Sequence, residues 1–260
     1  AKRQGLTPIL AGRNPAAVHA LGSLLGLECR IFDIHQPDRA KEALADIAVV
    51  AHCAGPFSAT SAPMIDACLA SATHYVDITG EISVFEAAHR RDQQAREQAV
   101  VVCPGVGFDV IPSDCLAACL HQALPDATHL ALGFDSGSGL SPGTAAIVMR
   151  LIDPLRPLLG LDAVQHWLKR LIEKRVSGPD EATRARQRTW LWGEARNAAG
   201  VVKTARLETA NGYDVTVHGA LLAVRHLLDY NGPGGYFTPS KLLGARCVEQ
   251  LPGSKAIRFD

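Results

Sequence analysis

The sequence predicts an α/β protein with a parallel β-sheet that is covered by helices on both faces. Two observations carry this prediction. In the first half of the chain, short apolar runs alternate with helical patterns, and the connections between them are rich in Gly, Pro and Asn. A strand that is followed by a helix returns in the same direction, so strands that alternate with helices form a parallel sheet.

The local signals place each element in order. Asn14 is a helix N-cap and Pro15 occupies the first turn of the helix that follows. The run 48–53 contains small and β-branched residues, as a buried strand does. We expect strands at 6–10, 29–34, 48–53, 74–79 and 99–102, and helices at 15–25, 38–45, 63–70 and 83–98.

This pattern is typical of the Rossmann-like, doubly wound fold, but its first unit is missing. The fingerprint G-x-G-x-x-G, which joins the first strand to the first helix, does not occur in the 260 residues. Residues 1–5 resemble a helix end closed by Gly5. We therefore expect that roughly 30 residues of a first βα unit are absent from the visible chain.

The second half predicts a smaller α+β domain. We expect a final strand of the first domain at 130–134, an antiparallel pair at 184–192 and 201–208, a third strand at 213–218 and a helix at 219–228. We therefore expect two domains: 1–134, which binds a dinucleotide, and a second, smaller domain at 135–260.

The composition excludes several function classes. The formal net charge is +0, which argues against nucleic-acid binding, and no apolar run is long enough to span a membrane. Seven cysteines are scattered without C-x-x-C spacing, so no metal site is expected. A cytoplasmic protein is the default. The amphipathic pattern 162–176 carries Lys169, Arg170, Lys174 and Arg175, and either covers a domain core or contacts an anionic membrane surface.

Ligands of such sheets bind where the strands end. Small residues there let a cofactor lie against the backbone, and the two glycines of Pro104-Gly105-Val106-Gly107 allow a close approach. Arg13 follows the strand 6–10, where an arginine accommodates the 2′-phosphate of NADP, while an acidic residue would bind the ribose of NAD. The cofactor-binding candidates are Arg13, Ala54, Gly55, Pro56, Phe57, Asp77 and Gly107.

Proton transfer needs an acid near the same strand ends. Asp109 lies on the glycine loop, Glu81 follows the strand 74–79, and Tyr75 is within that strand. Strand alternation directs only one of His74 and Tyr75 toward any given face. We expect Asp109, Tyr75 and Glu81 as catalytic residues, whereas Asp114 is typical of a helix start.

Several motifs in order resemble the saccharopine dehydrogenase-like oxidoreductases, closest to the subgroup of bacterial trans-acting enoyl reductases. The motifs are Leu10-Ala11-Gly12-Arg13-Asn14, Cys53-Ala54-Gly55-Pro56-Phe57, Ala67-Cys68-Leu69, His74-Tyr75-Val76-Asp77-Ile78-Thr79-Gly80-Glu81, Pro104 to Asp114, Leu140-Ser141-Pro142-Gly143-Thr144, Trp192-Gly193-Glu194, Asn211-Gly212-Tyr213 and Thr238-Pro239-Ser240. The resemblance implies that 135–260 is a substrate and dimerisation domain that packs on the sheet and helps to shape the substrate site. Near residue 145 the chain lacks the long β-rich insertion that such relatives carry. Either a missing segment near residue 145 or a natural deletion would account for this difference.

The leading hypothesis is an oxidoreductase that uses NADP rather than NAD and transfers hydride to or from a small or lipid-like substrate. A homodimer is expected. One alternative is a non-catalytic NADP-binding sensor or scaffold protein. Another is a membrane-associated reductase that contacts lipid through 162–176.

Overall fold

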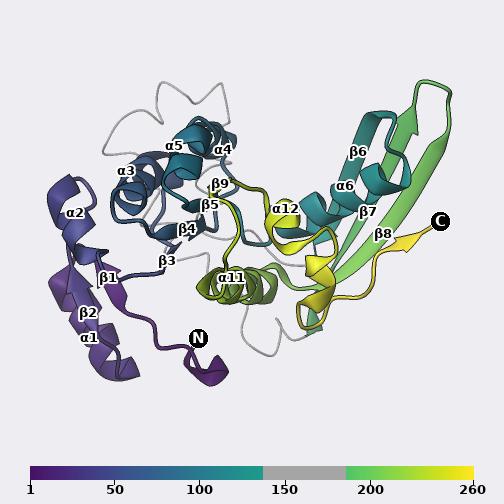
Figure 1. Ribbon diagram of the computed structural model, residues 1–260. Helices are drawn as coiled ribbons and strands as arrows, with labels where there is room; N and C mark the ends of the chain where they lie inside the picture. The colour runs from purple at the N-terminus through teal and green to yellow at the C-terminus, as the bar shows by residue number, and fades with distance from the viewer. Residues whose placement is uncertain (137–185) are drawn as a thin grey trace, which may run out of the picture.

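The computed structural model describes residues 1–136 and 186–260 (Figure 1). The predicted helix at 162–176, the motif at 140–144 and the proposed gap near residue 145 lie outside these residues. The elements of the first described part are η1 (Lys2–Gln4), β1 (Leu10–Gly12), α1 (Pro15–Leu25), β2 (Cys29–Ile31), α2 (Pro37–Ala43), β3 (Val49–His52), α3 (Phe57–Ala70), β4 (His74–Asp77), α4 (Ile82–His89), α5 (Asp92–Glu97), β5 (Val101–Cys103), α6 (Ile111–Ala123) and β6 (Ala127–Ser136). Those of the second are β7 (Arg188–Asn197), β8 (Val202–Ala210), α11 (Gly212–Leu228), β9 (Gly235–Tyr236), α12 (Pro239–Leu243), η3 (Cys247–Gln250) and β10 (Arg258–Phe259).

A parallel sheet of order β3-β4-β5-β9 forms the centre of the molecule, and this confirms the predicted fold class. Its last strand, β9, comes from the C-terminal half of the chain and pairs Gly235 with Val101. Helix α11 also packs against β3 and β4. Residues 212–236 therefore contribute to the sheet that the N-terminal half begins.

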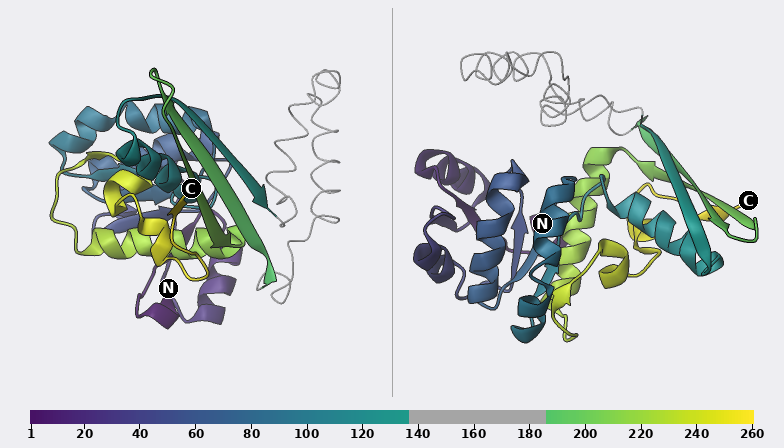
Figure 2. Two further views of the ribbon diagram at one scale, coloured as in Figure 1. Left: turned by 90° about the vertical axis from the view of Figure 1, so that its right-hand side faces the viewer. Right: turned by 90° about the horizontal axis from the view of Figure 1, so that it is seen from above.

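Strands β1 and β2 form a separate parallel pair, which shares no strand pairing with β3 in the described part of the chain. Figure 2 shows the purple β1–β2 unit on one side of the central sheet and the antiparallel sheet on the other.

The second sheet is antiparallel, in the order β10-β8-β7-β6. The predicted hairpin is confirmed, because β7 pairs with β8 along its length and Gly200 adopts a positive φ in the turn. Helix α6 packs on the inner face of this sheet, against β7 and β8. The larger core lies there, between α6, α11 and the sheet, and a second core surrounds Tyr75 and Ile65 under α3.

Four expected elements differ from the structure. The strand expected at 6–10 begins only at its last residue, because β1 pairs with β2 from Leu10 to Gly12. The strand expected at 130–134 exists, but it belongs to β6 and pairs with β7 in the antiparallel sheet. The expected helix 83–98 is two helices, α4 and α5; between them, Arg91 leaves the helical path and binds Asp66 of α3. The expected strand 213–218 is the start of α11, because the side chain of Asn211 accepts the N–H of Asp214 and caps a helix there.

Candidate functional site at the strand ends

Asp77, the last residue of β4, ties the ends of β4 and β5 together. Its carboxylate accepts the Tyr75 hydroxyl at 2.7 Å, the Thr79 N–H at 3.0 Å and the Gly105 N–H at 2.8 Å. Its carbonyl oxygen accepts the N–H of Val106 at 2.7 Å. The side chain is 1% exposed, and burial raises its pKa although the three hydrogen bonds oppose that rise. Asp77 therefore fixes the position of the glycine loop that follows β5.

Tyr75 is fully buried, and its hydroxyl donates to Asp77. Burial is the main cause that raises the pKa of this phenol, followed by the charge of Asp77. The hydroxyl of Tyr75 is therefore enclosed and already bonded, and the catalytic role predicted for Tyr75 stays a prediction. His74, on the opposite face of the strand, accepts the Val101 N–H through Nδ1 at 3.0 Å and so helps to align β4 with β5.

Glu81 orders the loop after β3. Its two carboxylate oxygens accept the N–H of Phe57 at 2.9 Å and of Ser58 at 3.2 Å, which are the first N–H groups of α3. A carboxylate at this place satisfies two unpaired donors and complements the helix dipole. The catalytic role predicted for Glu81 stays a prediction, and the structure places its carboxylate on the backbone of the predicted cofactor loop.

A second support of the same loop was not predicted from the sequence. His52, at the end of β3, is buried, and its Nε2 lies 3.0 Å from the hydroxyl of Thr60. That hydroxyl donates to the Ala54 carbonyl at 2.6 Å. Burial lowers the pKa of His52 to about 4, so the ring is neutral at physiological pH. In the sequence, the only signal for this role is a histidine at the end of a strand of small residues.

With this support, the loop presents an open backbone surface. Ala54, Gly55 and Pro56 are exposed and Phe57 is partly buried at the start of α3. Small exposed residues at a strand end allow an extended ligand to lie against the chain. The positions predicted for cofactor binding on this loop are thus accessible.

Gly107 lies deeper in the neighbouring loop. A Cβ atom at Gly107 would stand 3.3 Å from Thr216 of α11 and 3.5 Å from Ile78, so a larger residue would press the loop away from that helix. The hydroxyl of Thr216 accepts the N–H of Phe108 at 3.0 Å. Thr216 was not a candidate in the sequence, because its contact spans 108 residues.

Asp109 is the carboxylate that this network leaves available. It is exposed and accepts no hydrogen bond from any described residue. A Cβ atom at Gly80 would lie 3.1 Å from Asp109 Oδ2, so the carboxylate of Asp109 lies against the loop that follows β4. The protein atoms around it raise its pKa by desolvation. Asp77, Glu81, Gly107 and Asp109 are therefore brought to one edge of the sheet.

An aromatic pair stands beside Asp109. The rings of Phe108 and Phe134 meet edge to face with centroids 6.1 Å apart. Phe134 comes from β6 of the antiparallel sheet and is 65% exposed. An apolar wall from the second sheet therefore approaches the strand-end loops of the first.

Arg13 occupies a different place from the other candidates. It follows β1 in the separate strand pair and is exposed. Its guanidinium makes no hydrogen bond or ion pair with the residues that the structure describes. Arg13 is thus free to bind an anion, although no hydrogen bond joins it to the loops after β3, β4 and β5.

Residues 1–136 and 186–260 contain no group of three or more His, Cys, Asp or Glu side chains arranged to hold a metal ion. None of the helices within these ranges combines the length and hydropathy that crossing a bilayer requires.

Comparisons with known proteins agree with the motifs. No model of a known protein family matches the chain. The saccharopine dehydrogenase-like oxidoreductase of Mus musculus is 33% identical over 85 residues, which are 32% of this chain and 20% of the mouse protein. The trans-acting enoyl reductase of Mycobacterium ulcerans (strain Agy99) is 30% identical over 114 residues, which are 40% of this chain and 27% of the relative. These two matches therefore cover 20% and 27% of the lengths of the relatives.

The solved structure of apo saccharopine dehydrogenase (L-Glu forming) from Saccharomyces cerevisiae extends the likeness to nearly the whole chain. It superimposes with a TM-score of 0.56 at 12% identity, over 97% of this chain and 94% of the yeast chain. At this identity the match concerns the fold. The resemblance read from the motifs is confirmed: this chain is similar in sequence to saccharopine dehydrogenase-like oxidoreductases and trans-acting enoyl reductases, and it has the fold of saccharopine dehydrogenase.

Proposed function

We propose that this protein is an NADP-dependent oxidoreductase that transfers hydride between the nicotinamide and a C=N, C=C or C=O bond of a small or lipid-like substrate. One observation supports this proposal most strongly. The network around Asp77 and Glu81 orders two strand-end loops and leaves one carboxylate, Asp109, exposed between them with a raised pKa. The names of the relatives, which are oxidoreductases and reductases, support the reaction class.

The residues present fit a dinucleotide. The exposed backbone of Ala54, Gly55 and Pro56 would take the ribose and nicotinamide side of the cofactor, and Arg13 would take the 2′-phosphate through its planar guanidinium. NADP supplies or accepts the hydride when it is bound. The chain must position it, exclude water from the reacting atoms and move one proton.

Asp109 is suited to that proton. When hydride is added to the carbon of a C=N or C=O bond, the heteroatom takes up a proton; in the reverse direction it gives one up. A carboxyl group with a raised pKa holds its proton closer to neutral pH than an ordinary aspartate, which makes it a better general acid. We assign this proton transfer to Asp109.

The Phe108–Phe134 wall supports a substrate with an apolar part. Two aromatic rings beside a single carboxylate can bury the apolar surface of a ligand, but they supply few hydrogen-bond donors. An acyl or other hydrocarbon portion would pack against them while its polar end meets Asp109. The lipid-like substrate expected from the sequence suits this wall better than a small, uniformly charged one.

The cofactor preference is tested at Arg13. Replacing Arg13 with alanine is expected to weaken NADP binding about tenfold or more, because a charge-assisted hydrogen bond contributes about 1.5–3 kcal/mol. NAD binding should change less than about twofold, since NAD lacks the 2′-phosphate. Isothermal titration calorimetry of both nucleotides measures this. Arg90→Ala is the matched control, because Arg90 is also an exposed arginine, at the end of α4. An unaltered preference would remove Arg13 from the proposal.

A sensor or scaffold remains the second candidate function. Tyr75, Asp77 and Glu81 all bond within the protein, so three of the polar side chains at the strand ends are already committed to structure. A site that only binds NADP would need ordered strand-end loops but no side chain that transfers a proton. Turnover separates the two functions.

A further inference from the structure

Two buried hydroxyl groups near the candidate site have no hydrogen-bond partner. They belong to Thr189 of β7 and Tyr213 of α11, and neither bonds to any residue in the described ranges 1–136 and 186–260. Thr189 is only 1% exposed. An unpaired buried polar group destabilises a fold, so its presence in a native protein needs an explanation. A ligand that supplies the missing partner is one explanation.

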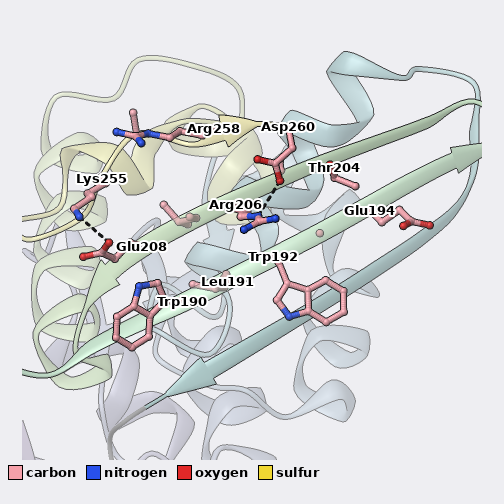
Figure 3. A pocket seen from close by; sticks show the side chains of 14 residues that line it. Trp190, Leu191, Trp192, Glu194, Thr204, Arg206, Glu208, Lys255, Arg258 and Asp260 are labelled. Atoms are coloured by element: carbon pink, nitrogen blue, oxygen red, sulfur yellow. Dashed lines mark hydrogen bonds and ion pairs between the residues drawn. The ribbon is translucent and has the colours of Figure 1, made fainter.

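Thr189 lies on the inner face of the antiparallel sheet. Trp190 and Trp192 project from the outer face (Figure 3), so Thr189 and Leu191, which alternate with them along β7, face inward. Leu191 pairs with Phe134 of β6. Residues directly opposite share a face, and their diagonal neighbours on that face lie roughly 7–8 Å away. Thr189 is therefore a diagonal neighbour of Phe134, the aromatic residue that the second sheet contributes to the site.

Tyr213 approaches the same region from α11. It stands in the first turn of the helix beside Gly212, where an added Cβ atom would lie 3.0 Å from a ring carbon of Phe108. Three residues further on, the hydroxyl of Thr216 accepts the N–H of Phe108 at 3.0 Å. Residues three apart are neighbours on a helix surface. The first turn of α11 therefore lies against the loop that carries Asp109.

The strand pairing brings Thr189 and Tyr213 to one end of the antiparallel sheet. Thr189 pairs with Thr209 of β8, and Tyr213 follows Thr209 by four residues. Thr209 is as deeply buried as Thr189, but its hydroxyl donates to the carbonyl of Ala210 at 2.9 Å. A buried hydroxyl at this end of the sheet can thus bond to the backbone, whereas the hydroxyl of Thr189 does not.

The side chains of this region follow one another in a definite order. Asp109 adjoins Phe108, and the rings of Phe108 and Phe134 have centroids 6.1 Å apart. Thr189 lies beyond Phe134 on the inner face of the sheet. A substrate whose reacting group meets Asp109, and whose hydrocarbon part packs on the two rings, would bring its far end to the unpaired hydroxyls.

We propose that the hydroxyls of Thr189 and Tyr213 bind a second polar group of the substrate, namely the neutral carbonyl oxygen of an ester or amide. This group is separated from the reacting bond by a hydrocarbon segment. Each hydroxyl is neutral and can donate one hydrogen bond, which suits an uncharged acceptor, while a buried carboxylate or phosphate would need a compensating charge. The inference rests on the proposed function and narrows its lipid-like substrate to one that is polar at both ends.

Binding of two series of ketones to the protein in the presence of NADP tests this inference without turnover. In one series an amide carbonyl follows the ketone after hydrocarbon spacers of increasing length, and in the matched series a methylene replaces that carbonyl. Isothermal titration calorimetry measures both. At the best spacer length, the native protein should bind the amide compound about tenfold more tightly than its hydrocarbon match, because two hydrogen bonds are gained.

Two variants remove the hydroxyls and keep the shapes of the side chains. Thr189→Val and Tyr213→Phe should each reduce the amide preference about threefold or more, with the hydrocarbon match bound within about twofold of native. Since each removes an unpaired buried group, the thermal midpoint without ligand should be unchanged or rise by about 2–4 °C. Thr209→Val is the matched control. It removes a bonded hydroxyl, so it should keep the amide preference and lower the midpoint by about 2–4 °C.

Three results would overturn the inference. The native protein could bind neither series, or bind both equally at every spacer length. The amide preference could survive in both Thr189→Val and Tyr213→Phe. Both variants could also lose as much thermal stability as Thr209→Val, which would show that the two hydroxyls are bonded without a ligand. Failure of the proposed function looks different: the native protein would keep the amide preference but reduce none of the ketones with NADPH.

Discussion

Replacing Asp77 with alanine is expected to lower the free energy of unfolding by about 3–5 kcal/mol. The substitution leaves three donors without an acceptor: the Tyr75 hydroxyl and the N–H groups of Thr79 and Gly105. Each unsatisfied buried group costs about 1–3 kcal/mol. Because the donors come from β4 and from the loops after β4 and β5, both loops should lose order together.

Two companion variants make the result specific. Tyr75→Phe removes one donor together with its hydrogen bond and should cost about 1 kcal/mol. Asp77→Asn keeps an oxygen for the two N–H groups and should fall between the other two variants. Urea unfolding, with an unchanged denaturant slope, measures all three. A loss in Asp77→Ala that is no larger than in Tyr75→Phe would show that the carboxylate does not hold the strand ends.

Asp109→Asn is expected to lower kcat by about 10²–10⁴-fold and to change KM little. This is the range that a positioned general acid contributes, and an amide cannot donate the proton in the same way. Circular dichroism and the unfolding midpoint should match those of the native protein, because Asp109 accepts no hydrogen bond from the described residues. Asp114→Asn is the control. Asp114 lies in the first turn of α6, and its carboxylate accepts the Ser240 N–H at 2.7 Å, so it should lose some stability and keep kcat within about threefold.

The pH dependence follows from the same side chain. Desolvation raises the pKa of Asp109 above its ordinary value of 3.8, so the protonated acid persists to higher pH than in an unperturbed aspartate. In the reductive direction the rate should fall as the pH rises through that raised pKa, because the acid loses its proton. The falling limb should be absent in Asp109→Asn. If the rate of Asp109→Asn falls with rising pH as the rate of the native protein does, another group transfers the proton.

Much of the fold could be predicted because its signals are local. The Asn14 cap, Pro15 in the first turn, and the small and β-branched run before Ala54 each depend on neighbours in sequence, and the structure contains the helix or strand that each predicts. The error at 213–218 has the same origin. Its β-branched and aromatic residues favour a strand, but the Asn211 cap and packing of α11 on β3 and β4 make it a helix.

The arrangement within the site could be predicted only in part. Strand ends of a parallel sheet must meet, so the sequence places Asp77, Glu81 and Asp109 at one edge. It does not say which of them is already bonded, since Glu81 reaches Phe57 across 24 residues and Asp77 reaches Gly105 across 28. The contact of Phe134 with Phe108 could not be predicted for another reason. It depends on the pairing of β6 with β7 in a different sheet.

Turnover of NADPH shows whether the strand-end loops carry out hydride transfer. NADPH oxidation is followed at steady state across a panel of imines, enoyl thioesters and ketones, with Asp109→Asn measured in parallel. The proposed function predicts turnover of at least one class, favouring members with an apolar chain, and its loss in Asp109→Asn. Tight NADPH binding without turnover of any member would contradict the proposed hydride transfer and identify the protein as a sensor of the cofactor.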